Sequence, residues 1–252
     1  MAPIPFELAH QDAVGWLQSL PADSVDLVIT DPAYESLEKH RAIGTTTRLK
    51  HSKSSSNDWF TIFPNARFGE LFREVYRVLR PDTHFYLLCD AETMFVAKPE
   101  AEQAGFRFWK PLVWDKCTIG MGYHYRARYE FILFFEKGKR KLNDLGVPDV
   151  LTIPRIRGGY PAEKPPEVAE ILITQSSQPG DVVCDPFMGS GSVGVAALRT
   201  QRRFLGNDLN AEAVKIAAKR LAEFGEGSIP PGLPEDVPDP QSDLFESLTA
   251  RE

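Results

Sequence analysis

Short apolar segments typical of β-strands alternate along most of this chain with segments that have helical periodicity. This alternation predicts an α/β fold, in which helices cover both faces of a mostly parallel, doubly wound sheet. Two aromatic-rich segments, 106–114 and 129–135, predict an antiparallel hairpin within it. The other expected strands are 25–30, 84–89, 181–184 and 203–205, and the expected helices are 68–79, 166–175, 193–199 and 211–224.

The length of 252 residues suits one large domain, which we expect over residues 1–224. The proline-rich segment 225–252 has few apolar anchors, so we expect a disordered tail there. The stretch 223–252 carries eight acidic residues against one basic residue, which accounts for the whole net charge of −6. The domain itself is therefore near neutral, and its charge does not argue against a nucleic-acid partner.

The composition also favours some compartments over others. The chain has neither an apolar run long enough to cross a bilayer nor a signal peptide at its start, so we expect no membrane association. Its three cysteines, Cys89, Cys117 and Cys184, are odd in number and far apart. This usage favours a reducing cytoplasm, with neither a disulfide framework nor a metal site.

The first turn of chemical interest, Asp31-Pro32-Ala33-Tyr34, directly follows the strand 25–30. Ligands of open α/β sheets bind beyond the carboxyl ends of strands, where this turn lies. An exocyclic amine such as N6 of adenine is a poor nucleophile, because its lone pair is delocalised into the ring. The Asp31 carboxylate and the Pro32 carbonyl are suited to hold its two hydrogens and redirect that lone pair, and Tyr34 offers a face for stacking an extruded base. The alternative is an ordinary strand-ending turn.

The second turn, Asp185-Pro186-Phe187-Met188-Gly189-Ser190-Gly191-Ser192, joins a strand to a helix. Its glycines allow a ligand to approach the backbone closely, and the helix start offers free N–H groups to an anion such as a carboxylate. Asp208 ends the next strand, where an acid can accept hydrogen bonds from ribose hydroxyls. The alternatives are a structural turn or a different nucleotide site.

Taken together, the two turns resemble the amino-group DNA methyltransferases of the permuted β class. In that family a DPPY-type motif precedes an FxGxG motif, as DPAY at 31–34 here precedes Phe187-x-Gly189-x-Gly191. The resemblance covers roughly residues 5–224 and implies a Rossmann-like fold that binds S-adenosylmethionine. Ala33 departs from the family's second proline, but the Pro32 carbonyl is retained.

The resemblance also assigns roles to residues. Asp31, Pro32 and Tyr34 would bind and orient the target base, with Ala33 in the same catalytic turn. Asp208 would hold the cofactor ribose, and Leu209 beside it is a further expected cofactor contact. The permuted order would place the N-terminal strand beside the strand that ends at Asp208. The remaining expected cofactor contacts are Asp12 and Ala13 at the adenine, Lys164 in a Lys-Pro element, and Asp185, Pro186, Phe187, Gly189, Ser190, Gly191 and Ser192 around the methionine part.

The implied activity is methyl transfer from S-adenosylmethionine to N6 of an adenine flipped out of double-stranded DNA, as in restriction–modification. An Asp at the start of the motif is commoner among adenine enzymes, so N4-cytosine methylation is the nearest alternative. A catalytically silent DNA-binding relative is another. A nicotinamide-dependent oxidoreductase would leave DPAY unexplained. Carbon-5 cytosine methylation would need a Pro-Cys pair, which the chain lacks.

Contacts with DNA are expected from basic residues, because phosphate neutralisation dominates nucleic-acid affinity. The family places its target-recognition region at about 138–162, which is short here. A homodimer, or the polar segment 35–57, would therefore help to cover the DNA site. The basic residues expected to contact DNA are Arg48, Lys50, Arg126, Lys139, Arg140 and Arg157.

Overall fold

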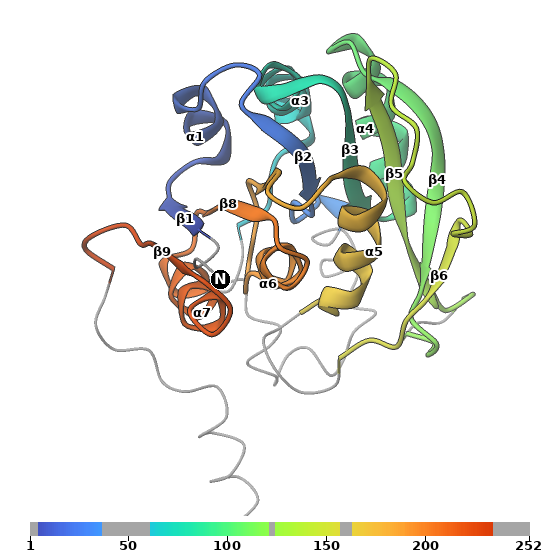
Figure 1. The fold of residues 1–252 in the computed structure, drawn as a ribbon. Helices are drawn as coiled ribbons and strands as arrows, with labels where there is room; N and C mark the ends of the chain where they lie inside the picture. Colours follow the sequence, from blue (N-terminus) through green and yellow to red (C-terminus); the bar gives the residue numbers. More distant parts are fainter. Residues whose placement is uncertain (1–4, 37–60, 121–123, 157–162, 234–252) are drawn as a thin grey trace, which may run out of the picture.

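The computed structural model describes residues 5–36, 61–120, 124–156 and 163–233, and within them a single mixed sheet organises the chain (Figure 1). The strands lie in the order β6-β4-β5-β3-β2-β7-β8-β1-β9. β5 is antiparallel to both β3 and β4, and the other pairings are parallel. The strands are β1 (Pro5–His10), β2 (Val25–Thr30), β3 (Leu79–Cys89), β4 (Arg107–Asp115), β5 (Tyr129–Lys137), β6 (Val150–Thr152), β7 (Val182–Asp185), β8 (Arg203–Asp208) and β9 (Glu226–Ser228).

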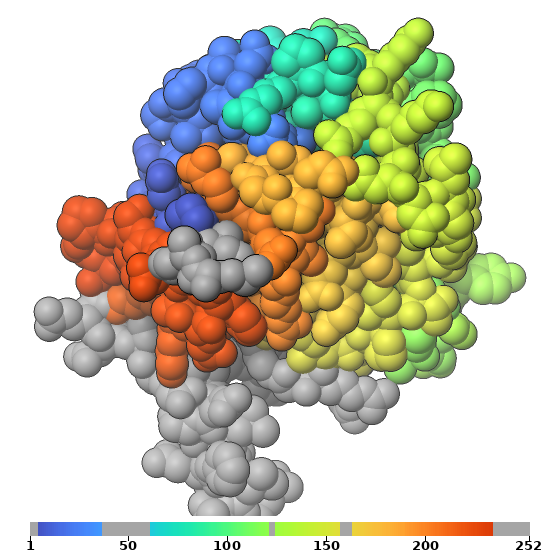
Figure 2. Space-filling view, viewed as in Figure 1, coloured from blue at the N-terminus to red at the C-terminus, as the bar shows by residue number. Residues whose placement is uncertain are grey.

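Helices cover both faces of this sheet and enclose two hydrophobic cores (Figure 1). One face carries α1 (Ala13–Ser19), α3 (Phe68–Val78), which follows the short 3₁₀ turn η4 (Asn65–Arg67), and α4 (Ala91–Gln103). The other face carries α5 (Pro166–Ser176), α6 (Ser192–Arg199) and α7 (Ala211–Leu221). Figure 1 shows α5, α6 and α7 in front of the sheet, and in Figure 2 atoms coloured gold to red occupy much of that face.

The local sequence explains the central elements. All six residues of β2 are buried, as expected of a parallel strand covered on both faces. α3 buries one stripe of apolar side chains spaced three or four residues apart. α1, α4 and α7 begin at N-caps Asp12, Asp90 and Asn210, whose side chains accept hydrogen bonds from backbone N–H groups of the first turn.

The arrangement of the sheet brings four strand ends together. β2, β7, β8 and β1 are consecutive and mutually parallel, so their carboxyl ends meet at one edge of the sheet. β1 pairs with β8 from Phe6 opposite Phe204 to His10 opposite Asp208. The expected position of the N-terminal strand is therefore confirmed, and this edge collects Asp31, Asp185 and Asp208.

The sequence predicted the fold class but missed the 13-residue helix α4 and the three-residue strand β9. α4 contains Pro99 and buries only the small residues Thr93, Ala97 and Ala101, so its apolar stripe is weak. β9 lies inside the predicted tail, but all of its residues are exposed and it pairs with β1 through the backbone. Residues 234–252 of that tail lie outside the described part. Within the described residues, no helix is both long and apolar enough to span a membrane.

Candidate active site

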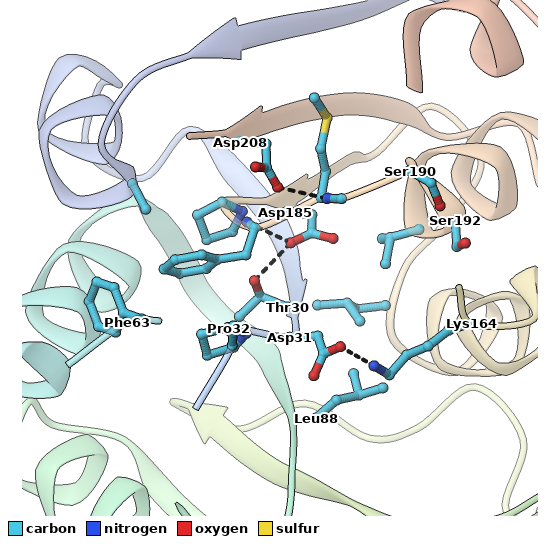
Figure 3. Close-up of a pocket in the computed structure, with 18 of the residues that line it drawn as sticks. Thr30, Asp31, Pro32, Phe63, Leu88, Lys164, Asp185, Ser190, Ser192 and Asp208 are labelled. Carbon is cyan, nitrogen blue, oxygen red and sulfur yellow. Dashed lines mark hydrogen bonds and ion pairs between the residues drawn. The ribbon is translucent and has the colours of Figure 1, made fainter. Parts of the chain in front are cut away.

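A cavity of about 500 Å³ opens at the edge of the sheet where these strand ends meet (Figure 3). Its volume lies within the range of small-molecule and cofactor sites. Both turns singled out in the sequence contribute to its wall, so their expected juxtaposition is confirmed. The expected site residues that line it are Asp12, Ala13, Asp31, Pro32, Ala33, Tyr34, Lys164, Asp185, Pro186, Phe187, Gly189, Ser190, Ser192, Asp208 and Leu209.

Asp185 ties the two turns together. Its Oδ1 accepts hydrogen bonds from the Thr30 hydroxyl at 2.7 Å and from the Phe187 backbone N–H at 3.0 Å. Thr30 is the last residue of β2, so these contacts fix the end of β2 against the glycine turn (Figure 3). Burial raises the pKa of the Asp185 carboxyl to about 7, because little water remains to solvate its charge.

The glycine turn has the backbone geometry that its sequence requires. Gly189 and Gly191 have φ angles of +50° and +80°, a region that side chains disfavour. A Cβ on Gly191 would lie 3.0 Å from the Cβ of Ala217 in α7, so this glycine also permits close packing. Unlike its neighbours, Gly191 is not among the lining residues. Its predicted contact with the cofactor stays a prediction.

Two polar side chains beside this turn, Asp208 and Ser192, face the cavity. Asp208 accepts hydrogen bonds from the backbone N–H groups of Gly189 at 2.9 Å and Asn210 at 2.8 Å, which orient its carboxylate at the cavity wall. The buried Ser192 hydroxyl lines the cavity and has no hydrogen-bond partner among the described residues. An unsatisfied buried hydroxyl beside an open glycine turn fits the polar end of a nucleoside or amino-acid ligand.

Asp12 lines the cavity and forms an ion pair that sequence reasoning missed. Arg67 donates to both of its carboxylate oxygens, at 2.7 and 2.9 Å. The hydrogen bonds from Arg67 hold the pKa of Asp12 below its usual value. The guanidinium also lies over the Phe63 ring, 5.3 Å from its centroid, and Phe63 makes an edge-on contact with Phe187. Arg67 and Phe63 both line the cavity, but neither belongs to a recognisable motif.

The catalytic-turn end of the cavity holds a chain of charged side chains. The Tyr34 hydroxyl donates to Asp31 Oδ1 at 2.7 Å, and the Lys164 ammonium is paired with Asp31 Oδ2 (Figure 3). Lys164 Nζ also lies 3.6 Å from Glu130 Oε2, and the other Glu130 oxygen is paired with Lys116. Sequence reasoning missed Glu130, and it expected Lys164 beside the cofactor without its pairing to Asp31.

Burial and the neighbouring charges shift the pKa values of Asp31 and Tyr34. Burial raises the pKa of Asp31, while the positive charge of Lys164 opposes that rise. Burial and the neighbouring Asp31 raise the pKa of the Tyr34 hydroxyl well above its usual value, so it remains a neutral donor. The Tyr34 ring is packed into the core beside α3 and only 7% exposed. Its position suits orientation of Asp31 more directly than the predicted stacking on a base, which stays a prediction.

The basic residues expected at DNA fall into three groups. Arg126 is exposed just before β5, near the cavity end of that strand. Lys139 and Arg140 follow the opposite end of β5, which runs about 26 Å from Tyr129 to Lys137. The antiparallel direction of β5 carries them to the edge of the sheet remote from the cavity, and their contact with DNA stays a prediction. Arg48, Lys50 and Arg157 lie outside the described residues.

No group of three or more His, Cys, Asp or Glu side chains suited to a metal ion occurs in the described parts of the chain. Among the described residues, the polar side chains that line the cavity are carboxylates, hydroxyls and two cations, Lys164 and Arg67. Such a lining can bind a polar organic cofactor at the glycine turn and a hydrogen-bonding substrate at Asp31.

Comparisons with known proteins agree with this geometry. The structure of TTHA0409, a DNA modification methylase from Thermus thermophilus complexed with S-adenosyl-L-methionine, superposes with a TM-score of 0.63, at 24% identity, over 88% of this chain and 99% of that one. The PvuII DNA methyltransferase, which is cytosine-N4-specific, gives a TM-score of 0.67 at 18% identity, over 100% and 96% of the two chains. The predicted methyltransferase fold is thereby confirmed.

Sequence comparison identifies the family. The DNA adenine methyltransferase YhdJ of Escherichia coli (strain K12) is 26% identical over 253 residues, which cover 85% of this chain and 82% of that protein. The profile of the DNA methylase family, of the N6/N4 methyltransferase type, matches residues 25–156 and 146–219. These matches include both turns that line the cavity. The chain therefore belongs to the DNA methylase family of N6/N4 amino-methyltransferases.

Proposed function

We propose that this DNA methyltransferase transfers a methyl group to N6 of an adenine that is flipped out of double-stranded DNA. The observation that carries the proposal is the shared cavity: Asp31 and Pro32 line the same cavity as the glycine turn and Asp208. Base flipping costs a few kcal/mol, which contacts in such a pocket offset. The order of the two motifs and the pairing of β1 with β8 support assignment to the permuted β class.

The cofactor is S-adenosylmethionine, which supplies the methyl group as an electrophile on sulfur. We assign its methionine end to the glycine turn, where Ser192 has an unused hydroxyl and the start of α6 offers N–H groups. The Asp208 carboxylate, held by two backbone N–H groups, would accept the ribose hydroxyls. The part of the wall formed by Asp12, Arg67 and Phe63 would enclose the adenine.

Asp31 and Pro32 would orient the target amine. The carboxylate and the prolyl carbonyl each accept one hydrogen of the NH₂ group, which directs the nitrogen lone pair towards the methyl group. Proline fixes its own φ and keeps this acceptor in place before the base arrives. The nitrogen carries one excess proton after it gains the methyl group, and Asp31 is the carboxylate placed to accept it.

The preference for adenine over cytosine rests on the aspartate at the start of the motif and on the similarity to YhdJ. Arg126, at the cavity end of β5, is the described residue that we assign to phosphate contact. The proposed contacts of Arg48, Lys50 and Arg157, and the recognition region at 138–162, complete this part of the proposal.

The direct test is identification of the product. The purified chain is incubated with double-stranded DNA of mixed sequence and S-adenosylmethionine carrying a heavy-isotope methyl group, and the DNA is digested to nucleosides for mass spectrometry. We expect labelled N6-methyladenosine in its deoxy form. Labelled N4-methylcytosine alone would overturn the adenine assignment, and absence of any labelled nucleoside under binding conditions would overturn methyl transfer itself.

A further inference from the structure

We propose that Lys164 is a movable partner of Asp31, and that Glu130 is a positioning residue that receives Lys164 when the target base enters. The inference rests on the proposed function and deepens it, because it concerns how the base gains access to Asp31. It is carried by the charged side chains between β2, β5 and the start of α5, and by one buried acceptor that has no hydrogen bond.

Both oxygens of the Asp31 carboxylate are engaged in this structure. Oδ1 accepts from the Tyr34 hydroxyl, and Oδ2 is paired with the Lys164 ammonium. Each carboxylate oxygen has a second lone pair, but the Lys164 ammonium lines the cavity at Oδ2 and competes with the donor amine of a target base for that side of Asp31. Unhindered binding of the amine therefore requires that one of the two present partners moves.

Lys164 is the partner that can move. The Tyr34 hydroxyl is fixed by a ring packed in the core, where only 7% of the residue is exposed. Lys164 instead carries its charge on a flexible four-carbon stem and has three donors that can be redirected. It also has a second acceptor close by, since its Nζ lies 3.6 Å from Glu130 Oε2.

Glu130 is prepared to receive the ammonium. Its Oε1 is paired with Lys116, whereas its Oε2 is buried and lacks a hydrogen-bond partner among the described residues. Leaving such an acceptor unsatisfied is costly. A charge-assisted hydrogen bond has a length of about 2.8 Å, so a shift of about 0.8 Å by Lys164 would satisfy Glu130. Rotation of its four-carbon stem beyond that shift would then separate the ammonium from Asp31.

The move of Lys164 would also make Asp31 a stronger base when the target amine binds. While Lys164 is paired with Asp31, its positive charge stabilises the carboxylate and weakens it as a base. Transfer of Lys164 to Glu130 weakens that stabilisation as the amine arrives. Tyr34, Lys116, Cys89 and Asp185 remain around the pair and complete its charged and titratable surroundings.

The test replaces Glu130 by Gln, which keeps its size but removes its charge. In single-turnover methylation of double-stranded DNA by the full chain, we expect Glu130→Gln to lower the rate about 10- to 100-fold, the range of one charged hydrogen bond. The dissociation constant for S-adenosylmethionine should stay within about twofold, because the cofactor does not contact Glu130 in this scheme. Glu130→Asp should recover part of the rate, since it restores the charge.

A matched control is available on the same strand. Glu136 is a glutamate on the same face of β5 and is even more buried than Glu130, but it lies six residues further along, about 20 Å away. Glu136→Gln should leave the single-turnover rate within about twofold once the folded fraction is taken into account. Equal losses in the two variants would assign the effect to damage of β5 and overturn the proposal.

A double substitution separates the relay from a direct role of Glu130. In a Lys164→Met background, Glu130→Gln should change the rate by less than about twofold, because its partner is already absent. Additive losses would overturn the relay. The outcomes also distinguish the two proposals. A wild-type chain that methylates no DNA contradicts the proposed function, whereas normal turnover by Glu130→Gln contradicts only the relay.

Discussion

The two halves of the cavity are held together in different ways. At the cofactor half, Asp185 accepts a hydrogen bond from one backbone N–H group and Asp208 from two, and the glycine turn is fixed by its φ angles. At the base half, Asp31, Lys164 and Glu130 contact one another through side chains. A site fixed by backbone is preorganised, whereas a side-chain network can exchange partners. The cofactor half is thus built to bind, and the base half to rearrange.

The largest expected effect tests the base half. We expect Asp31→Ala to reduce methyl transfer at least about 1,000-fold, since it removes the acceptor of the amine and of its proton. Affinity for S-adenosylmethionine, measured by calorimetry, should change less than about threefold, because the cofactor contacts belong to the other half. Turnover near the wild-type rate would remove the role assigned to Asp31, and loss of cofactor binding would break the distinction between the halves.

Asp208→Ala tests the cofactor half in the opposite sense. We expect the dissociation constant for S-adenosylmethionine to rise about 10- to 100-fold, which corresponds to roughly 1.4–2.7 kcal/mol. Turnover at saturating cofactor should fall much less than in Asp31→Ala. Asp208→Asn keeps an acceptor for the Asn210 backbone N–H, so it serves as the milder control. An unchanged dissociation constant in both variants would contradict the ribose assignment.

Asp185 lies at the junction of the two halves, and its pKa of about 7 predicts how stability depends on pH. An unfolded Asp has a pKa near 3.9, so between about pH 4 and pH 7 the folded chain retains a proton that the unfolded chain has lost. The free energy of unfolding should therefore fall as pH rises through this window, by at most ~1.4 kcal/mol per pH unit from this group. Urea denaturation at several pH values measures it.

Asp185→Asn should flatten that part of the pH profile. The amide is neutral at every pH, and its oxygen can still accept from Thr30 and from the Phe187 N–H. The difference in unfolding free energy, variant minus wild type, should therefore be more positive at pH 8 than at pH 4. Parallel profiles of the two proteins would show that the Asp185 carboxyl is ionised normally, and that the junction is not a buried neutral acid.

The sequence predicted more of the cofactor half than of the base half, for a physical reason. β2 has the bounds expected for it, because a short apolar run is ended by Asp31-Pro32. Asp185 and Asp208 were placed correctly in the cavity because parallel strands bring their carboxyl ends to one edge. Such contacts follow from strand direction and from glycine, both of which are visible in a local pattern.

The missed contacts depend on register and on distant segments. Glu130 reads as one polar position in an aromatic strand, and only the pairing of β5 with β3 carries it to Lys164. Arg67 reaches Asp12 across 55 residues. The direction of β5 likewise decides that Lys139 lies at the remote edge. A local pattern contains neither the partner of a strand nor the end of the sheet that a loop reaches.

The smallest expected effect tests whether the backbone fixes the cofactor half. Gly191→Ala forces a side chain into a positive φ of 80° and against Ala217 at 3.0 Å, whereas Gly180→Ala has a similar φ of 90° but nothing within 4 Å. Both should lose ~1–2 kcal/mol of unfolding free energy from the backbone strain. Gly191→Ala should lose about 1 kcal/mol more from overpacking, measured by urea denaturation. Equal losses would mean that α7 yields to the extra methyl group, and that the turn owes its shape to φ alone.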